Sequence, residues 1–513
     1  MFMESLKETL NEDFNVSITE NGAIGFRTTG KELLDANFKV SSMRNWSEKQ
    51  IVDQFVKVFY ENKLYAIKWL FYVRDAREGI GERRLFRACM KYLGKQHMDI
   101  AKAVIPLVAE YGRWDDLLCL LDTDLSSDVV AIVKSQLTVD MQGMNDGKPI
   151  SLLAKWLPSC NTNSKETKRL SRIIYKSIGM TERQYRKMLS KLRAYLKVVE
   201  VSMSKKEWGA IDYSAVPSRA NLIYNGAFLR NDEERRRAYL SSLQKGETKI
   251  NAGVLFPHDI VHRYCDLTGW RRSMKSKDDV TLEELWKALP DFVNGAGNTI
   301  VVADGSGSMT ATIGGTSVTA LDVANALAIY FAERSSGQFK DNYITFSTRP
   351  KLVDFSKAKS LREKIEIAFR HNEVADTNIE AVFDLILQTA IKNNMTQDEL
   401  PQNILMLSDM EFNQCARANN SSRPTQRLFD VFAQKYAEHG YKLPRLVFWN
   451  ICSRTGTIPV KENDLGVALV SGFSPAIVKM VLSNSTDPLE CLLEQLNSER
   501  YNAVEEAVKS VIA

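Results

Sequence analysis

The chain has 513 residues, 44% of them hydrophobic and 26% charged, and a formal net charge of +5. This length predicts two or three domains, and the composition is that of an ordinary soluble globular protein. No apolar run approaches the roughly 20 residues that span a bilayer, and the acidic, polar start of the chain is unlike a secretory signal. We therefore expect a cytoplasmic protein without a membrane partner.

The cysteines and histidines argue against two further classes of protein, those held by disulfides and those built on a zinc site. The seven cysteines are spread singly, without a C-x-x-C pair, and the five histidines show no zinc-binding spacing. An odd number of separated cysteines argues against a disulfide scaffold and a zinc ribbon, and favours reduced thiols.

The net charge is unevenly distributed along the chain. Residues 1–295 carry a net charge of +9, and residues 296–513 carry −4. Residues 165–277 alone hold 25 Lys and Arg against 11 Asp and Glu. This concentration of positive charge suggests a polyanionic partner for that region.

The first part of the chain is expected to be helical after a short arm. Residues 1–45 are polar and rich in Asn, so we expect a loosely ordered arm with short strands or turns at best. From Trp46 apolar residues recur at helical spacing, beginning with a helix over 47–59. Short helices joined by polar turns predict an all-α repeat of HEAT type, a solenoid, over residues 46–295, with an irregular helical bundle as the alternative. Further helices are predicted at 63–74, 82–93, 98–111, 114–121 and 127–141.

Two strongly basic helices follow, at 164–177 and 181–198. In each helix three cations recur every four residues and so line one face, with tyrosines nearby. Such a stripe can follow a phosphate backbone, and aromatic rings can stack on bases. The alternative is a solvated helix face above core tyrosines, but a second basic cluster after residue 205 favours nucleic acid. The predicted RNA-binding residues are Lys168, Arg172, Lys176, Arg183, Lys187, Lys191, Arg235, Arg236, Arg271 and Arg272.

From Asn298 onward strands and helices alternate, which is typical of a doubly wound α/β fold with a mostly parallel sheet. This domain is placed at residues 296–485, and a helical tail at 486–513 closes the chain. The predicted strands are 298–304, 342–346, 402–408, 444–450 and 466–470, with an edge strand at 351–355. The predicted helices are 319–335, 357–369, 378–393, 425–438 and 474–483.

The first of these strands ends in a candidate metal site. A run of Ile and Val stops at Asp304 and is followed by Gly-Ser-Gly-Ser, so Asp304, Ser306 and Ser308 alternate in a tight loop at the carboxyl edge of the sheet. Gly305 and Gly307 let the backbone bend so that one carboxylate and two hydroxyls converge. Hard oxygen ligands predict Mg²⁺ or Mn²⁺ as the cofactor.

This D-x-S-x-S pattern resembles the metal-ion-dependent adhesion site (MIDAS) of von Willebrand factor A domains. The resemblance implies two further oxygen donors, which match Thr377, ahead of an amphipathic helix, and Asp409, at the end of the strand 402–408. It also implies an open coordination position that an acidic side chain of a partner fills. The predicted ligands are Asp304, Ser306, Ser308, Thr377 and Asp409.

A helical repeat followed by such an A domain resembles the TROVE-domain Ro family of ribonucleoproteins. The segments 74–83 (RDAREGIGER), 153–159 (LAKWLPS) and 216–220 (VPSRA) resemble more closely an uncharacterised Ro-like family of phages, giant viruses and plants. The resemblance covers most of residues 46–485. It implies a helical ring with a basic hole that takes single-stranded ends of small structured or misfolded noncoding RNAs, and an exonuclease as a partner.

Two functions remain open on this basis. One is a noncatalytic Ro-like RNA-binding protein, and the other is a protein-interaction scaffold whose metal site captures an acidic residue of a partner. Enzyme activity is not expected, because the proposed site holds only two carboxylates, whereas two-metal phosphodiester chemistry requires several. The sequence also contains no P-loop and no G-x-S-x-G nucleophile motif.

Overall fold

The computed structural model describes residues 14–20, 24–266, 273–274, 277–293, 298–346, 349–372, 378–411, 432–460, 466–481 and 487–512. The chain divides into two compact units, and each contains segments that are far apart in sequence. We call residues 1–47 with 255–498 the sheet unit, and residues 48–254 with 499–513 the helical unit. This division differs from the predicted boundaries at residues 45, 295 and 485, and the packing described below gives the reason.

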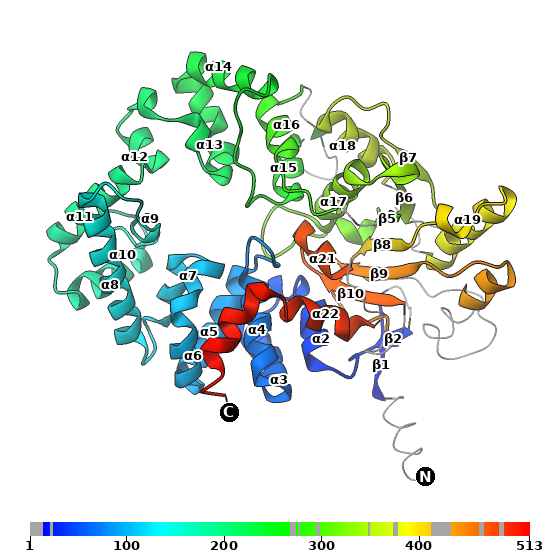
Figure 1. The fold of residues 1–513 in the computed structure, drawn as a ribbon, viewed down its shortest axis with the longest axis horizontal. Coiled ribbons are helices and arrows are strands. Elements are labelled where there is room, and N and C mark those ends of the chain that lie inside the picture. The colour runs from blue at the N-terminus through cyan, green and yellow to red at the C-terminus, as the bar shows by residue number, and fades with distance from the viewer. Residues whose placement is uncertain are drawn as a thin grey trace, which may run out of the picture. The chain divides into compact units, whose positions relative to one another are not determined.

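A six-stranded sheet forms the centre of the sheet unit (Figure 1). All neighbouring pairs are parallel except β6 and β7, which are antiparallel, so the predicted mostly parallel sheet with one edge strand is confirmed. Every residue of β5 is buried, which explains its continuous apolar run. The strand order is β10 (Val467–Ser471), β9 (Arg445–Asn450), β8 (Asn403–Ser408), β5 (Thr299–Asp304), β6 (Asn342–Phe346) and β7 (Leu352–Asp354).

The helix after the metal motif is the most buried helix of the sheet unit. It is α17 (Ala320–Arg334), it contacts β5, β6 and β8, and nearly all of its residues are buried. It begins with a capping box in which Thr319 and Asp322 satisfy the free N–H groups of the first turn. Further α-helices of this unit are α15 (Pro257–Tyr264), α16 (Val280–Lys287), α18 (Leu361–Arg370), α19 (Ile379–Lys392), α21 (Val478–Val481) and α22 (Pro488–Leu496).

Two of these helices lie in the region predicted to be helical repeat. Helix α15 packs on both α16 and α17, so residues 255–293 belong to the sheet unit. The predicted helix 425–438 begins outside the described residues, and its described end is helical from Phe432. A short hairpin of β3 (Cys265–Asp266) and β4 (Ser273–Met274) was not predicted.

The amino-terminal segment is a folded part of the sheet unit, and the expected loose arm is corrected for its described residues. Strands β1 (Val16–Ile18) and β2 (Ile24–Phe26) form an antiparallel hairpin, and Phe26 pairs with Ile458. Helix α2 (Glu32–Phe38) packs on β10 and α22. Its apolar side chains are fully buried, which the polar composition of the segment as a whole concealed.

The helical unit consists of successive helices in which sequence neighbours pack on each other, such as α3 with α4 and α13 with α14. The predicted helical region is therefore confirmed. The chain returns to this unit at its end, where α23 (Asn502–Val508) packs on α4 and α6. No helix among the described residues has the length and apolar character needed to cross a bilayer. The remaining α-helices are α3 (Glu48–Glu61), α4 (Lys63–Arg74), α5 (Arg83–Gln96), α6 (Met98–Val104), α7 (Val108–Tyr111), α8 (Ser126–Asn145), α9 (Leu153–Trp156), α10 (Lys165–Ser177), α11 (Glu182–Tyr195), α12 (Val199–Ser204), α13 (Ser218–Asn231) and α14 (Glu233–Gln244).

Candidate metal site and basic helix surface

The candidate metal site begins with the carboxylate at the end of β5. Asp304 is buried, and its Oδ1 accepts a hydrogen bond of 2.9 Å from the backbone N–H of Ser306. Its Oδ2 accepts one of 2.6 Å from the hydroxyl of Ser408, the last residue of β8. These two bonds hold the carboxylate at the carboxyl edge of the sheet. Burial raises the pKa of Asp304 above its ordinary value.

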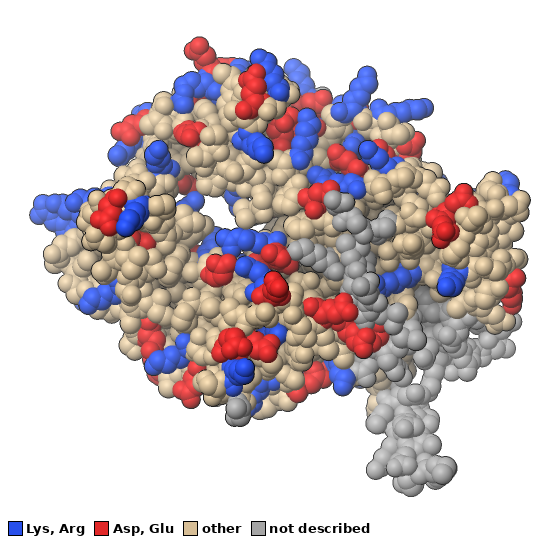
Figure 2. Space-filling model, viewed as in Figure 1, with Lys and Arg blue, Asp and Glu red and all other residues tan. Residues whose placement is uncertain are grey.

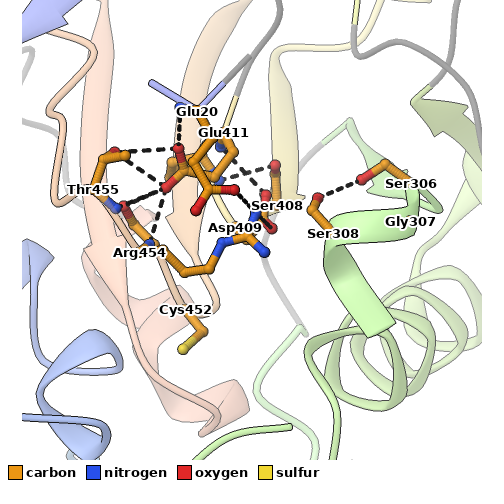
Figure 3. A network of polar contacts seen from close by, with 12 residues as sticks. Glu20, Ser306, Gly307, Ser308, Ser408, Asp409, Glu411, Cys452, Arg454 and Thr455 are labelled. Carbon is orange, nitrogen blue, oxygen red and sulfur yellow. Dashed lines mark hydrogen bonds and ion pairs between the residues drawn. The ribbon is translucent and has the colours of Figure 1, made fainter. Parts of the chain in front are cut away.

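The two serines and the second carboxylate meet at the same edge. The hydroxyls of Ser306 and Ser308 are 2.9 Å apart, and the Ser308 hydroxyl is among the groups that influence the pKa of Asp409. Figure 3 shows the serines approaching from the loop after β5 and Asp409 from the end of β8. Burial and the nearby charge of Asp304 raise the pKa of Asp409 to about 7. The structure therefore brings four of the five predicted ligands together, and Thr377 lies outside the described residues.

The backbone after Asp409 adopts a conformation that side chains rarely take. Met410 has a φ angle of 62°, in the left-handed region, and it is buried. Its backbone N–H donates to the hydroxyl of Ser408 at 3.1 Å, and the backbone N–H of Glu411 donates to Asp409. The sharp turn keeps Asp409 at the end of β8 and directs Glu411 toward the loop after β9.

The donor set fits a hard divalent cation. Two buried carboxylates and two hydroxyls provide oxygen atoms only, and a cation between the carboxylates would offset both the burial and the repulsion from Asp304 that raise the pKa of Asp409. The described residues contain no group of three or more His, Cys, Asp or Glu side chains suited to a metal. The proposed centre differs from such a group because half of its donors are hydroxyls.

Four residues of this region were missed by the sequence reasoning. They are Ser408, which orients Asp304, and Glu411, Arg454 and Glu20, which form a polar network beside Asp409. Ser408 stands directly before the predicted ligand Asp409, so its position at a strand end was an available signal. Glu20 and Arg454 carried no signal, because they are separated from Asp409 by long stretches of chain.

The basic helices α10 and α11 expose their predicted cationic stripes. Neither stripe forms an ion pair with any described residue, and all six side chains are exposed. Figure 2 shows Lys and Arg side chains standing out from the surface over α11. The six residues are Lys168, Arg172 and Lys176 on α10, and Arg183, Lys187 and Lys191 on α11.

Neighbouring basic residues on the same helices are neutralised. Arg169 pairs with Asp122 at 2.7 Å and with Glu166 at 2.6 Å, and Arg186 lies 3.8 Å from Glu182. The absence of acidic partners is therefore a property of the stripes and not of the helices as a whole.

The tyrosines between the stripes differ in their accessibility. Tyr185 is fully buried, and its hydroxyl donates to the carbonyl of Pro158, so it is a core residue and cannot stack on a base. Tyr195 is 36% exposed, and its hydroxyl donates to the carbonyl of Lys148.

The predicted RNA contact at Arg236 is corrected by its packing, and Arg235 makes contacts within the helical unit. Arg236 is fully buried: its guanidinium donates to the side-chain oxygens of Asn221 and Asn225 and lies over three aromatic rings. Arg235 is exposed but pairs with Asp232 at 2.9 Å and donates to two backbone carbonyls. Both arginines hold the fold together. The predicted residues Arg271 and Arg272 lie outside the described residues.

Comparison with known proteins gives one relative that covers nearly the whole chain. It is the uncharacterised protein L728 of Acanthamoeba polyphaga mimivirus, 32% identical over 532 residues, which cover 96% of this chain and 89% of the relative. The chain belongs to the family of this mimivirus protein. Two family models also match, a domain of unknown function (DUF2828) at residues 163–298 and another (DUF7788) at residues 298–511.

Each of the two domain models covers one of the two regions described above. The first model covers the basic helices, and the second covers the sheet with Asp304 and Asp409. Among solved structures, the chain is similar to the Ro (RSR) protein of Deinococcus radiodurans, with 13% sequence identity and a TM-score of 0.35 over 90% of this chain and 93% of that one.

Proposed function

We propose that this protein binds RNA through the helical unit and does not catalyse a reaction on it. The observation that carries the proposal is the set of six exposed, unpaired cations on α10 and α11. Spacing of four residues puts neighbouring cations about 6 Å apart along a helix, so each stripe is a row about 12 Å long. Rows of this kind suit consecutive phosphates of a backbone, and release of counterions drives the association.

Small structured or misfolded noncoding RNA with single-stranded ends is the proposed ligand. This choice rests on the resemblance of a helical repeat followed by an A domain to the TROVE-domain Ro family. The partly exposed ring of Tyr195 at the end of α11 adds a surface on which an unpaired base can stack.

The test is a triple substitution of one stripe, Lys168→Gln, Arg172→Gln and Lys176→Gln, with RNA binding measured across a salt series. The plot of log affinity against log salt should flatten by about 2, because single strands contribute about 0.7 per phosphate contact. The matched control is Arg169→Gln, Arg186→Gln and Arg237→Gln, which removes the same charge from residues already paired with acids. Equal losses of RNA affinity in both triple variants would mean that RNA responds only to the net charge of the protein, and would contradict a specific role of the stripe.

The metal site is proposed to hold Mg²⁺ or Mn²⁺ for recognition of a protein partner, through an acidic side chain that completes the coordination. The supporting observation is the convergence of Asp304, Ser306, Ser308 and Asp409 at one sheet edge. An exonuclease that processes the bound RNA is one partner of this kind. The alternative function is a protein-interaction scaffold in which the metal site alone recognises the partner. Such a protein should purify without bound RNA.

The metal assignment is tested by the double variant Asp304→Ala, Asp409→Ala. It should bind no Mn²⁺ in calorimetry while its RNA affinity changes less than twofold, because the basic stripes lie in the other unit. Metal uptake equal to that of the unchanged protein would refute the site.

A further inference from the structure

An arginine, Arg454, stands beside the candidate metal site. The Nη2 atom of Arg454, in the loop after β9, lies 3.6 Å from Oδ2 of Asp409 and 2.7 Å from Oε2 of Glu20. Its side chain is 33% exposed, whereas that of Asp409 is 4% exposed. Figure 3 shows the side chain extending toward Asp409. A positive charge therefore already neutralises part of the site.

The backbone on either side of this contact is fixed by one buried carboxylate. Glu411 accepts hydrogen bonds from the backbone N–H of Arg454 at 2.9 Å and of Thr455 at 3.0 Å on its Oε1, and from that of Glu20 at 2.9 Å on its Oε2. The exposed fraction of Glu411 is 1%. Glu411 follows the candidate ligand Asp409 by two residues, and it anchors the main chain of Arg454. The side chain of Arg454 can therefore turn outward while its main chain stays in place.

We infer that Arg454 is an internal counter-ion of the metal site and sets its affinity for divalent cations. The inference rests on the proposed metal site and adds a residue that tunes it. A cation bound by Asp409 is placed beside the guanidinium, and two like charges at such a short separation repel each other strongly in a partly buried site. Binding of the metal must therefore compete with Arg454, and its side chain turns outward as the ion enters.

Glu20 links the competition between Arg454 and the metal ion to the amino-terminal hairpin. Its carboxylate bonds to the same Nη2 atom that approaches Asp409, and it follows β1 in the chain. Glu20 therefore holds Arg454 at the site when no cation is bound.

The experiment measures the dissociation constant for Mn²⁺ by titration calorimetry on the full chain. Arg454→Gln removes the competing charge and should tighten Mn²⁺ binding by about tenfold, which corresponds to a modest change in electrostatic repulsion. Arg454→Lys keeps the charge and should bind like the unchanged protein. Arg362→Gln is the matched control, since Arg362, on α18, pairs with Asp278 and Glu366, and its loss should leave Mn²⁺ affinity unchanged.

Salt provides a second readout. The difference between Arg454→Gln and the unchanged protein should shrink as KCl rises, because screening weakens repulsion between partly exposed charges. A circular dichroism spectrum equal to that of the unchanged protein shows that each variant is folded.

The outcomes separate this inference from the metal site itself. Equal or weaker Mn²⁺ binding by Arg454→Gln, with normal uptake by the unchanged protein, overturns the role of Arg454 and leaves the site intact. Absence of Mn²⁺ uptake by the unchanged protein overturns the metal site and, with it, the inference.

Discussion

Arg236 illustrates how the same residue type serves opposite purposes in one helix. In α14 it is buried among Tyr213, Phe228 and Tyr239, while the adjacent Arg237 is 69% exposed and pairs with Glu233. A run of three arginines in a sequence gives no sign of which one faces inward, because the helix face is decided by the tertiary contacts.

Arg236→Ala should destabilise the helical unit by about 3 kcal/mol, because it leaves a cavity and removes the donors to the buried amide oxygen of Asn221 and the half-buried one of Asn225. The measurement is the free energy of unfolding in urea. Arg237→Ala is the control and should change that free energy by less than about 0.5 kcal/mol, since an exposed ion pair contributes little. Similar losses for both variants would show that Arg236 does not have the buried position described.

At the scale of elements, the three segments that resemble the Ro-like family are joints of the helical unit. Segment 74–83 supplies Arg74, which pairs with the buried Asp116 at 2.6 Å. Segment 153–159 wraps around Arg193, which donates to the carbonyls of Ala154 and Leu157. Segment 216–220 contributes the carbonyl of Val216, which accepts from two asparagines. These motifs hold helices together and do not themselves mark a binding surface.

The end of the chain is fixed to the first helices by an ion pair that is largely buried. Arg500 pairs with Asp75 at 2.8 Å, the carboxylate of Asp75 is fully buried, and Arg500 also bonds to Glu110. The ring of Tyr111 lies beneath the guanidinium at 4.5 Å. The same contact lowers the pKa of Glu110 below its ordinary value.

Arg500→Ala should destabilise the helical unit by about 3 kcal/mol, because it leaves the carboxylate of Asp75 buried without its counter-ion. Thermal unfolding monitored by circular dichroism provides the measurement. Lys509→Ala, a change at a 73% exposed residue on the same segment, should have almost no effect. A small loss from Arg500→Ala would mean that the final segment is dispensable for the unit.

At the scale of the whole molecule, charge is divided between the two units. The helical unit carries a net charge of +11 and the sheet unit carries −6. Residues 165–254 hold 20 Lys and Arg against 9 Asp and Glu, so they account for the entire excess of the helical unit. The predicted basic region of 165–277 is therefore reduced to residues 165–254, since residues 255–277 belong to the sheet unit.

This division predicts where bound RNA crosslinks. After ultraviolet irradiation of the complex, crosslinked peptides identified by mass spectrometry should come mainly from residues 165–195, which contain α10 and α11. Peptides from β5 and β8 should be absent, because a polyanion avoids the two carboxylates at the sheet edge. Crosslinks concentrated in the sheet unit would contradict the proposed RNA surface.

Much of this protein follows from local sequence alone. The buried strands, the helix at 63–74 and the loop with Asp304, Ser306 and Ser308 are set by apolar periodicity and by glycines, which act over a few residues. Because parallel strands end at one edge, the sequence also determined that Asp409 would meet that loop.

The tertiary structure alone decided the rest, because it depends on contacts between distant residues. It placed α2 and α15 in the sheet unit, returned the last helix to the helical unit, and buried Arg236 while leaving Arg172 exposed. It also brought Arg454 and Glu20 to Asp409. The environment of a side chain is set by the residues that pack against it. A partner hundreds of residues away does not change the spacing of apolar and polar residues near that side chain, so the local sequence cannot indicate it.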